Sequence, residues 1–211
     1  MIERVSTPRG DLQLQRRGTH YEVISNGSFL MATYNGGSER ALIDLALEWL
    51  PQVQTVLIGG LGVGYTLRAA LDLPGVRQVT VVEIEPKVVE WNAAHLADFN
   101  GHALADPHTG LVLADLNDYL TSCPSEAFDL IALDTDNGPD WTVYPENARL
   151  WGSEALGQLD RVRTRGGGLA FWSAAPSPPF ERLLRKRFHE VRIAPITAAL
   201  AEADDFVYLA R

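Results

Sequence analysis

Hydrophobic positions follow two different periods along this chain. Between residues 11 and 34 they alternate roughly by twos, and the Asn26-Gly27 pair interrupts the alternation. Alternation broken by Asn-Gly predicts short strands joined by tight turns. From Ser38 the apolar positions take the spacing of one helical face, and Pro51 ends that pattern. The first quarter of the chain is therefore predicted to hold short strands and then a helix.

The rest of the chain alternates apolar runs with helical patterns. The runs that predict strands are VQTVLIG, RQVTVVE, TGLVLA, FDLIALD, GGGLAFW, HEVRIAPI and DFVYLAR. Helices between the first six predict a parallel sheet covered on both faces. Too few residues separate the last two runs for a crossover helix, so the last strand should be antiparallel. This α/β arrangement resembles the Rossmann-like class I methyltransferase fold. We expect it over residues 37–211, after a small β region over 1–36.

Glycine occupies every second position directly after the first strand of this sheet, at Gly60, Gly62 and Gly64. Ligands of open α/β sheets bind beyond the carboxyl ends of the strands, at this point of the chain. The alternative is a tight turn without a ligand. Tyr65 stands where a dinucleotide-binding loop has its last glycine, which disfavours NAD and FAD. The G-x-G-x-G spacing resembles the S-adenosylmethionine loop of class I methyltransferases.

Three residues near the ends of the next two strands complete the expected nucleoside site. Glu83 follows Gly64 by nineteen residues, close to the offset at which a carboxylate reaches a ribose diol. Ile84 resembles the apolar residue that packs on the adenine ring, and burial in the sheet is the alternative. Asp115 resembles the acid that contacts the adenine amino group, although an Asp here is equally suited to capping a helix.

Longer segments resemble the spermidine synthase family, which uses this fold for aminopropyl transfer. TVLIGGLGVGYTLRAAL and VVEIEP resemble the glycine loop and the V-E-I-D-P segment of that family. FDLIALDTDNGPD resembles its Y-D-V-I-I-x-D-S-S-D-P-x-G-P motif. The resemblance covers most of residues 20–175. It implies an S-adenosylmethionine-type nucleoside, a small cationic amine as acceptor and a homodimer formed through the N-terminal region.

This chain departs from the family pattern where the family binds its donor. The family loop is G-G-G-D-G-G, whose aspartate binds the charged end of decarboxylated S-adenosylmethionine, and Gly62 stands in that place here. Leu30 or Met31 replaces an N-terminal glutamine that contacts the nucleoside. The second aspartate of the fourth-strand motif is Asn137, with Asp136 one place earlier. The nucleoside-binding residues are thus kept, whereas the donor-specific ones are weakened.

The first aspartate of that motif, Asp134, is the candidate catalytic base. A carboxylate at the end of a strand can orient an ammonium and accept its proton. Asp136, Asp140, Trp141 and Tyr144 are candidate substrate-binding residues, because carboxylates and aromatic rings together suit an organic cation. The alternative is a solvated acidic loop in which Asp134 caps a turn.

Composition excludes several other classes of function. The 211 residues carry a formal net charge of −9, which argues against nucleic-acid binding. The five histidines lack metal-ligand spacing, and the fifth strand, FWSAAP, lacks the Asp-Asn pair of metal-dependent O-methyltransferases, so we expect no metal. A single cysteine, no apolar leader and no run of membrane-spanning length favour a cytoplasmic protein without membrane contact.

The expected activity is alkyl transfer to a small, cationic acceptor. Because the loop lacks its aspartate at Gly62, methyl transfer from S-adenosylmethionine is the preferred hypothesis. One alternative is a polyamine aminopropyltransferase that uses decarboxylated S-adenosylmethionine. The other is a non-catalytic nucleoside-binding protein.

Overall fold

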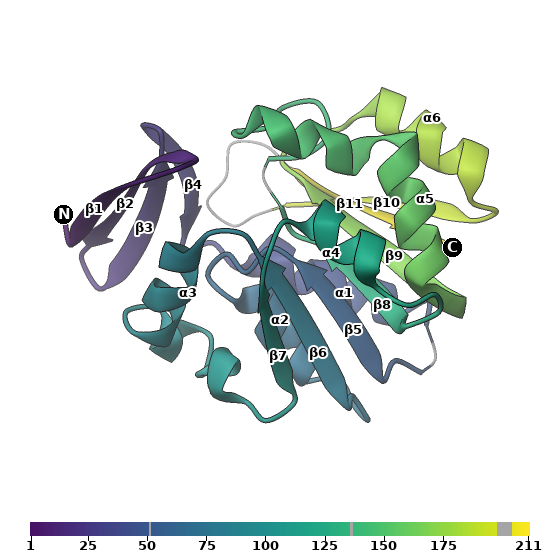
Figure 1. Ribbon diagram of the computed structural model, residues 1–211, viewed down its shortest axis with the longest axis horizontal. Coiled ribbons are helices and arrows are strands. Elements are labelled where there is room, and N and C mark those ends of the chain that lie inside the picture. The colour runs from purple at the N-terminus through teal and green to yellow at the C-terminus, as the bar shows by residue number, and fades with distance from the viewer. Residues whose placement is uncertain (51, 136, 198–203) are drawn as a thin grey trace.

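The computed structural model describes residues 1–50, 52–135, 137–197 and 204–211, which form two separate β-sheets and the helices around them (Figure 1). The small sheet is antiparallel, and its strands lie in chain order. They are β1 (Glu3–Thr7), β2 (Gly10–Arg17), β3 (His20–Ser25) and β4 (Ser28–Ala32). Asn26 and Gly27 form the β3–β4 turn with φ of 50° and 80°, as a two-residue hairpin turn requires. Strand β1 was not predicted from the sequence.

The large sheet has seven strands in the order β10-β11-β9-β8-β5-β6-β7. Their bounds are β5 (Thr55–Gly59), β6 (Gln78–Glu83), β7 (Thr109–Leu113), β8 (Phe128–Leu133), β9 (Arg163–Ser173), β10 (Val191–Ile196) and β11 (Asp205–Ala210). Strands β5 to β9 run parallel, and β11 lies antiparallel between β9 and β10. The predicted fold class is confirmed.

Helices cover both faces of the large sheet. The helices are α1 (Gly37–Leu47), α2 (Tyr65–Leu71), α3 (Pro86–Ala93), α4 (Leu116–Ser122), α5 (Ser153–Val162) and α6 (Pro178–Arg187). The first three pack with Val56 and Ile58 of β5 on one face, and the last three pack with Leu57 on the other. Alternate residues of one strand are therefore buried on opposite faces, as expected of a parallel sheet between helical layers. No helix in the described part of the chain has the length and apolarity needed to cross a bilayer.

Short 3₁₀ helices account for the differences from the predicted helices. These are η1 (Ala97–Phe99), η2 (Ala103–Ala105) and η3 (Pro145–Trp151). The helical pattern of the sequence over residues 86–97 is interrupted, because α3 ends at Ala93 and η1 follows after a turn. The loop expected over residues 135–151, which carries the candidate acceptor residues, ends in η3.

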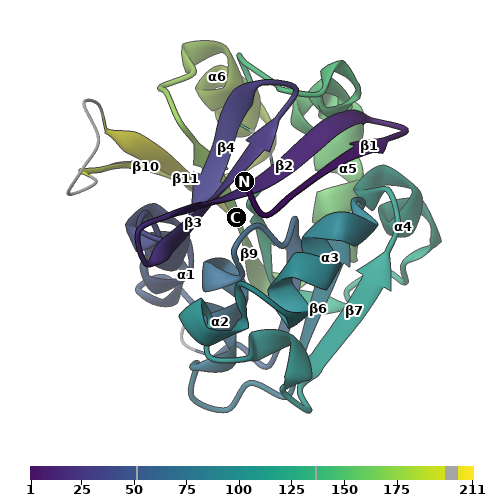
Figure 2. The same ribbon diagram turned by 90° about the vertical axis from the view of Figure 1, so that its left-hand side faces the viewer.

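The small sheet packs on helix α3. Leu12, Leu14 and Val23 form a buried cluster with Trp91 and Leu96. A hydrogen bond of 2.8 Å from the indole nitrogen of Trp91 to a Glu3 carboxylate oxygen adds to this contact. In both views the small sheet therefore lies beside α3, across one end of the large sheet (Figures 1 and 2).

Candidate functional site

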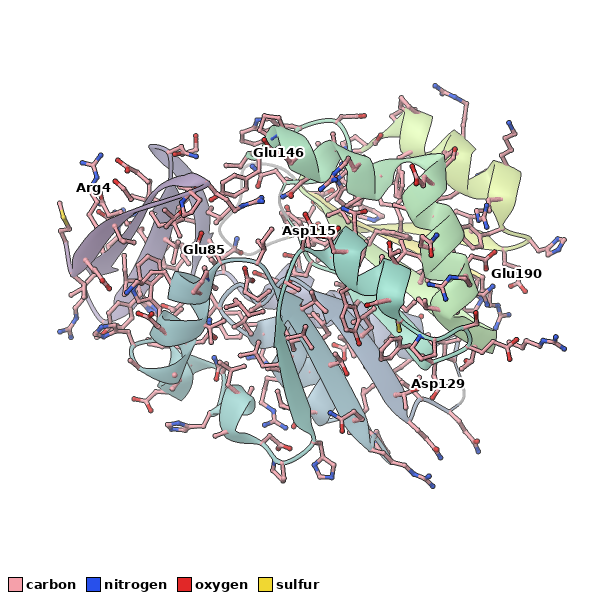
Figure 3. All side chains as sticks on the ribbon, viewed as in Figure 1. Arg4, Glu85, Asp115, Asp129, Glu146 and Glu190 are labelled. Carbon is pink, nitrogen blue, oxygen red and sulfur yellow. The ribbon has the colours of Figure 1, made fainter. Side chains whose placement is uncertain are left out.

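A pocket lies between the carboxyl edge of the large sheet and the small sheet. The lining residues that the sequence predicted for the nucleoside or the reaction are Gly60, Gly62, Glu83, Ile84, Asp115 and Asp134. Figure 3 shows Asp115 and Glu85 on the side of the large sheet that faces the small sheet. Leu12, Leu30 and Met31 of the small sheet close the other side. The two positions considered as replacements for the family glutamine therefore both reach the pocket.

The three loop glycines are needed for different reasons, although all have positive φ. A Cβ on Gly60 would lie 2.3 Å from the backbone oxygen of Asp134. A Cβ on Gly64 would lie 2.7 Å from the side chain of Asn100. A Cβ on Gly62 would meet only the sulfur of Met31, at 3.6 Å, and would otherwise fill the pocket. Gly60 and Gly64 thus serve the packing of the protein itself, whereas Gly62 leaves room for a ligand.

Glu83 binds the glycine loop as well as lining the pocket. One carboxylate oxygen accepts the N–H of Leu61 at 2.8 Å, and the other accepts the N–H of Glu85 at 2.8 Å. Burial raises the pKa of Glu83, and these backbone hydrogen bonds oppose the rise. Each carboxylate oxygen has a second lone-pair site, so Glu83 can hold the loop and still accept a ribose hydroxyl. The loop-holding role was not predicted from the sequence.

Ile84 and Asp115 both line the pocket, beyond the carboxyl ends of the neighbouring strands β6 and β7. Ile84 follows the end of β6 and lines the pocket. Asp115 is the N-cap of α4, since its carboxylate accepts the N–H of Asn117 at 2.8 Å. Its other oxygen accepts a hydrogen bond of 3.0 Å from Arg149. The capping role foreseen for Asp115 is thus present, and its contact with adenine stays a prediction.

Asp134 follows directly after β8 and faces the pocket. The hydroxyl of Thr66, in the first turn of α2, donates to its Oδ2 at 2.6 Å. Burial raises the pKa of Asp134 to about 6, the Thr66 hydrogen bond opposes this, and the nearby Asp205 raises it further. A carboxylate whose pKa lies near neutrality is suited to accepting a proton from an amine.

A second carboxylate, Glu39 in the first turn of α1, lines the same pocket and was not predicted. Burial, followed by the negative charge of Asp134, raises its pKa to about 8. In the described part of the chain neither carboxylate has an ion pair with Lys, Arg or His. The sequence marks Glu39 only as an acid at a helix start, which is a common place for a carboxylate.

Of the four candidate acceptor residues, the structure places Tyr144 in the pocket and two others outside it. Tyr144 lines the pocket, where its hydroxyl lies 2.6 Å from that of Ser25 and its ring lies 4.4 Å from the Arg9 guanidinium. Asp140 is exposed, Trp141 is 61% exposed, and neither lines the pocket. Asp136 lies outside the described residues. Among the residues that the structure describes, no group of three or more His, Cys, Asp or Glu side chains could hold a metal ion.

Comparisons with known proteins identify relatives of this chain. A family model described as the spermine/spermidine synthase domain matches residues 37–148. Putrescine N-methyltransferase 2 of Nicotiana attenuata is 29% identical over 133 residues, which are 60% of this chain and 34% of that protein. The polyamine aminopropyltransferase of Saccharolobus islandicus is 32% identical over 125 residues, 59% of this chain and 40% of the other. The polyamine aminopropyltransferase of Sulfolobus acidocaldarius is 31% identical over 138 residues, which are 65% of this chain and 44% of that protein. The matches thus span less than half the length of these relatives.

Solved structures share the fold over nearly the whole chain. A crystal structure of spermidine synthase in complex with the transition state analogue AdoDATO has a TM-score of 0.84. It is 17% identical in sequence, and the match covers 99% of this chain and 72% of that one. Spermidine synthase from Thermotoga maritima has a TM-score of 0.82 with the same identity and coverage. Likeness at this identity establishes the fold alone.

Proposed function

The chain belongs to the spermine/spermidine synthase family, and we propose that it is a transferase that moves an alkyl group from an S-adenosylmethionine-type nucleoside to a polyamine. One observation carries the proposal. The pocket joins an open glycine loop and the Glu83 carboxylate to two further carboxylates without ion-pair partners in the described part of the chain. The glycine loop and Glu83 suit a nucleoside, and the two further carboxylates suit a cationic amine.

The residues of the pocket fit such a donor in three ways. Gly62 keeps open a space that any Cβ would occupy, Glu83 has free lone pairs for a ribose diol, and Ile84 offers an apolar surface. When bound, the donor supplies an electrophilic carbon next to a sulfonium, whose sulfur keeps the electron pair as the carbon leaves. Asp134 orients the acceptor and accepts a proton from its ammonium group, which frees the nitrogen lone pair that then forms the new C–N bond.

Aminopropyl transfer is the better supported of the two alkyl transfers. Polyamine aminopropyltransferases of Saccharolobus islandicus and Sulfolobus acidocaldarius are among the curated relatives, and the matching family model is that of the spermine/spermidine synthase domain. The methyl transfer preferred from the sequence is the second candidate. Two observations favour it, namely the absence of a carboxylate from the loop at residues 60–64 and the likeness to putrescine N-methyltransferases.

Calorimetric titration of the folded protein tests the proposal. We expect binding of methylthioadenosine and of at least one of S-adenosylmethionine and its decarboxylated form. Incubation with putrescine and each donor then identifies the product, because mass spectrometry distinguishes an added aminopropyl group from an added methyl group. Nucleoside binding without either product would leave the non-catalytic alternative, and failure to bind all three nucleosides would overturn the proposal.

The homodimer implied by the family resemblance and the cytoplasmic location stay predictions. The dimer is expected to form through the N-terminal region, and light scattering after size exclusion measures it. A monomer at micromolar concentration would contradict it.

A further inference from the structure

Glu39 and Asp134 reach the pocket from different elements, and Thr66 contacts the backbone of the first and the side chain of the second. The Thr66 Oγ1 lies 2.6 Å from Oδ2 of Asp134 and 3.3 Å from the backbone oxygen of Glu39. Thr66 is buried, and its two contacts connect helix α1 to the end of β8. The Glu39 carboxylate accepts a hydrogen bond of 3.1 Å from the neighbouring Ser38 hydroxyl. Neither acid is neutralised by an ion pair in the described residues, as noted above.

We propose that Glu39 and Asp134 together form the subsite for the ammonium group of the acceptor, and that they share one proton until the amine enters. This inference rests on the proposed function, since it assigns the acceptor to a particular pair of residues. Binding of the ammonium displaces the shared proton to solvent and leaves both carboxylates ionised. Ionised Asp134 then accepts a proton from the bound ammonium, which leaves its nitrogen with the lone pair needed for attack on the donor carbon.

The charges around the pair explain why a proton is held there. Two carboxylates in one poorly solvated pocket cannot both ionise without cost, so they titrate as a unit. Values of about 8 for the pKa of Glu39 and about 6 for that of Asp134 mean that the pair holds close to one proton at pH 7. Asp205, at the start of β11, adds a further negative charge. The nearby Arg40 lies over the ring of Tyr65, 4.9 Å from its centroid.

An unpartnered hydroxyl in the same wall points independently to a ligand. Thr135 directly follows Asp134 and lines the pocket, yet its buried Oγ1 has no hydrogen-bond partner in the described part of the chain. A buried polar atom without a partner is rare, because the lost hydrogen bond costs free energy. The hydrogen-bonding capacity of this hydroxyl is therefore left for a group that the described part of the chain does not supply.

Titration with putrescine in the presence of saturating methylthioadenosine tests the inference. Calorimetry at pH 7 in two buffers of different ionisation enthalpy counts the protons released on binding. The wild-type protein should release close to one proton. Glu39→Gln should release far less, bind putrescine about tenfold more weakly or worse, and bind methylthioadenosine as before. Asp44→Asn is the matched control, since it removes the same charge from an exposed position of α1.

The outcomes separate the inference from the proposed function. Binding of methylthioadenosine but not of putrescine to the wild-type protein would remove the amine acceptor and overturn both. Equal putrescine affinity and equal proton release in wild type and Glu39→Gln would overturn the role of Glu39 and leave the proposed function standing. If Glu39→Gln does not fold, the wild-type titration decides alone. Proton release must then fall towards zero as the pH rises from 7 to about 9, and constant release would contradict the shared proton.

Discussion

The two ends of strand β8 each have an aspartate, and the surroundings of the two are opposite. Asp129, near the start of the strand, accepts four hydrogen bonds. They come from the N–H of Gln54, the N–H and hydroxyl of Thr55, and the hydroxyl of Thr164. In the described part of the chain, Asp134, just past the end, accepts one side-chain hydrogen bond, from Thr66. Figure 3 shows Asp129 at the end of the large sheet away from the small sheet.

The protein stabilises the ionised form of Asp129 but the protonated form of Asp134. Burial alone would raise the pKa of Asp129, but its hydrogen bonds together lower it below the ordinary value. At Asp134 burial dominates, and the pKa rises to about 6. The amino edge of the sheet thus uses a carboxylate to tie β5, β8 and β9 together. At the carboxyl edge, the Asp134 carboxylate has few hydrogen-bond donors around it among the described residues. This is the state expected of a group that binds a ligand or moves a proton.

The largest expected effect is that of Asp134→Asn, which removes the ionisable group of the carboxyl edge. Turnover should fall by about 10²–10⁴-fold, the usual contribution of a general base, while nucleoside affinity is kept. Because folding raises the pKa of Asp134 from 3.8 to about 6, its ionisation lowers the free energy of unfolding as pH rises through that range, so the variant should be at least as stable at pH 8. Steady-state rates and urea unfolding measure both. Full turnover would instead support a turn-capping role, which Asn fills nearly as well.

Gly62→Asn should abolish nucleoside binding without unfolding the protein. Asn tolerates the φ of 54° at this position, and its side chain would enter the pocket. Gly75→Asn is the matched control at the amino edge, because Gly75 has a φ of 82° with open space around it and does not line the pocket. We expect affinity for methylthioadenosine to fall by about 100-fold or more in the first variant only. Equal affinities in a calorimetric comparison would show that no ligand approaches Gly62.

Asp129→Asn should lower stability rather than activity. Hydrogen bonds to a charged group contribute about 1.5–3 kcal/mol, and the free energy of unfolding at pH 7 should fall by an amount of that order. Because folding lowers the pKa of Asp129, its stabilisation is present above the unfolded value and is lost as pH falls through the folded one. The gap between wild type and variant, measured by urea unfolding, should therefore narrow below about pH 4. Loss of turnover per folded molecule in Asp129→Asn would contradict the assignment of stability to the start of β8 and of activity to its end.

Local patterns predicted much of this molecule. Apolar runs with helices between them predict the seven strands of the large sheet. Because ligands bind beyond the ends of such strands, the same runs predict that Glu83 and Asp134 line the pocket. Glu39 could not be found this way, because its role depends on α1 packing against the end of β8, far away in sequence. The same applies to the ion pair between Arg149 and Asp115. Trp141 and Tyr144 are three residues apart, but only the second lines the pocket, so composition alone did not separate them.

The smallest expected effect comes from Thr66→Val, which removes the hydrogen bond that Thr66 donates to Asp134. The variant thereby increases the difference in hydrogen bonding between Asp134 and Asp129. That bond lowers the pKa of Asp134, so the variant should have a higher pKa and need a higher pH to ionise the base. A bond of about 1 kcal/mol corresponds to a shift of roughly 0.7 pH unit. The acid limb of the pH–rate profile should move upward by about that amount, while the rate on the alkaline plateau is kept. Thr66→Ser retains the hydroxyl and should restore the wild-type limb. A limb that stays in place in Thr66→Val would mean that Asp134 does not control it, and an equal shift in both variants would show that loss of the Thr66 hydroxyl is not the cause.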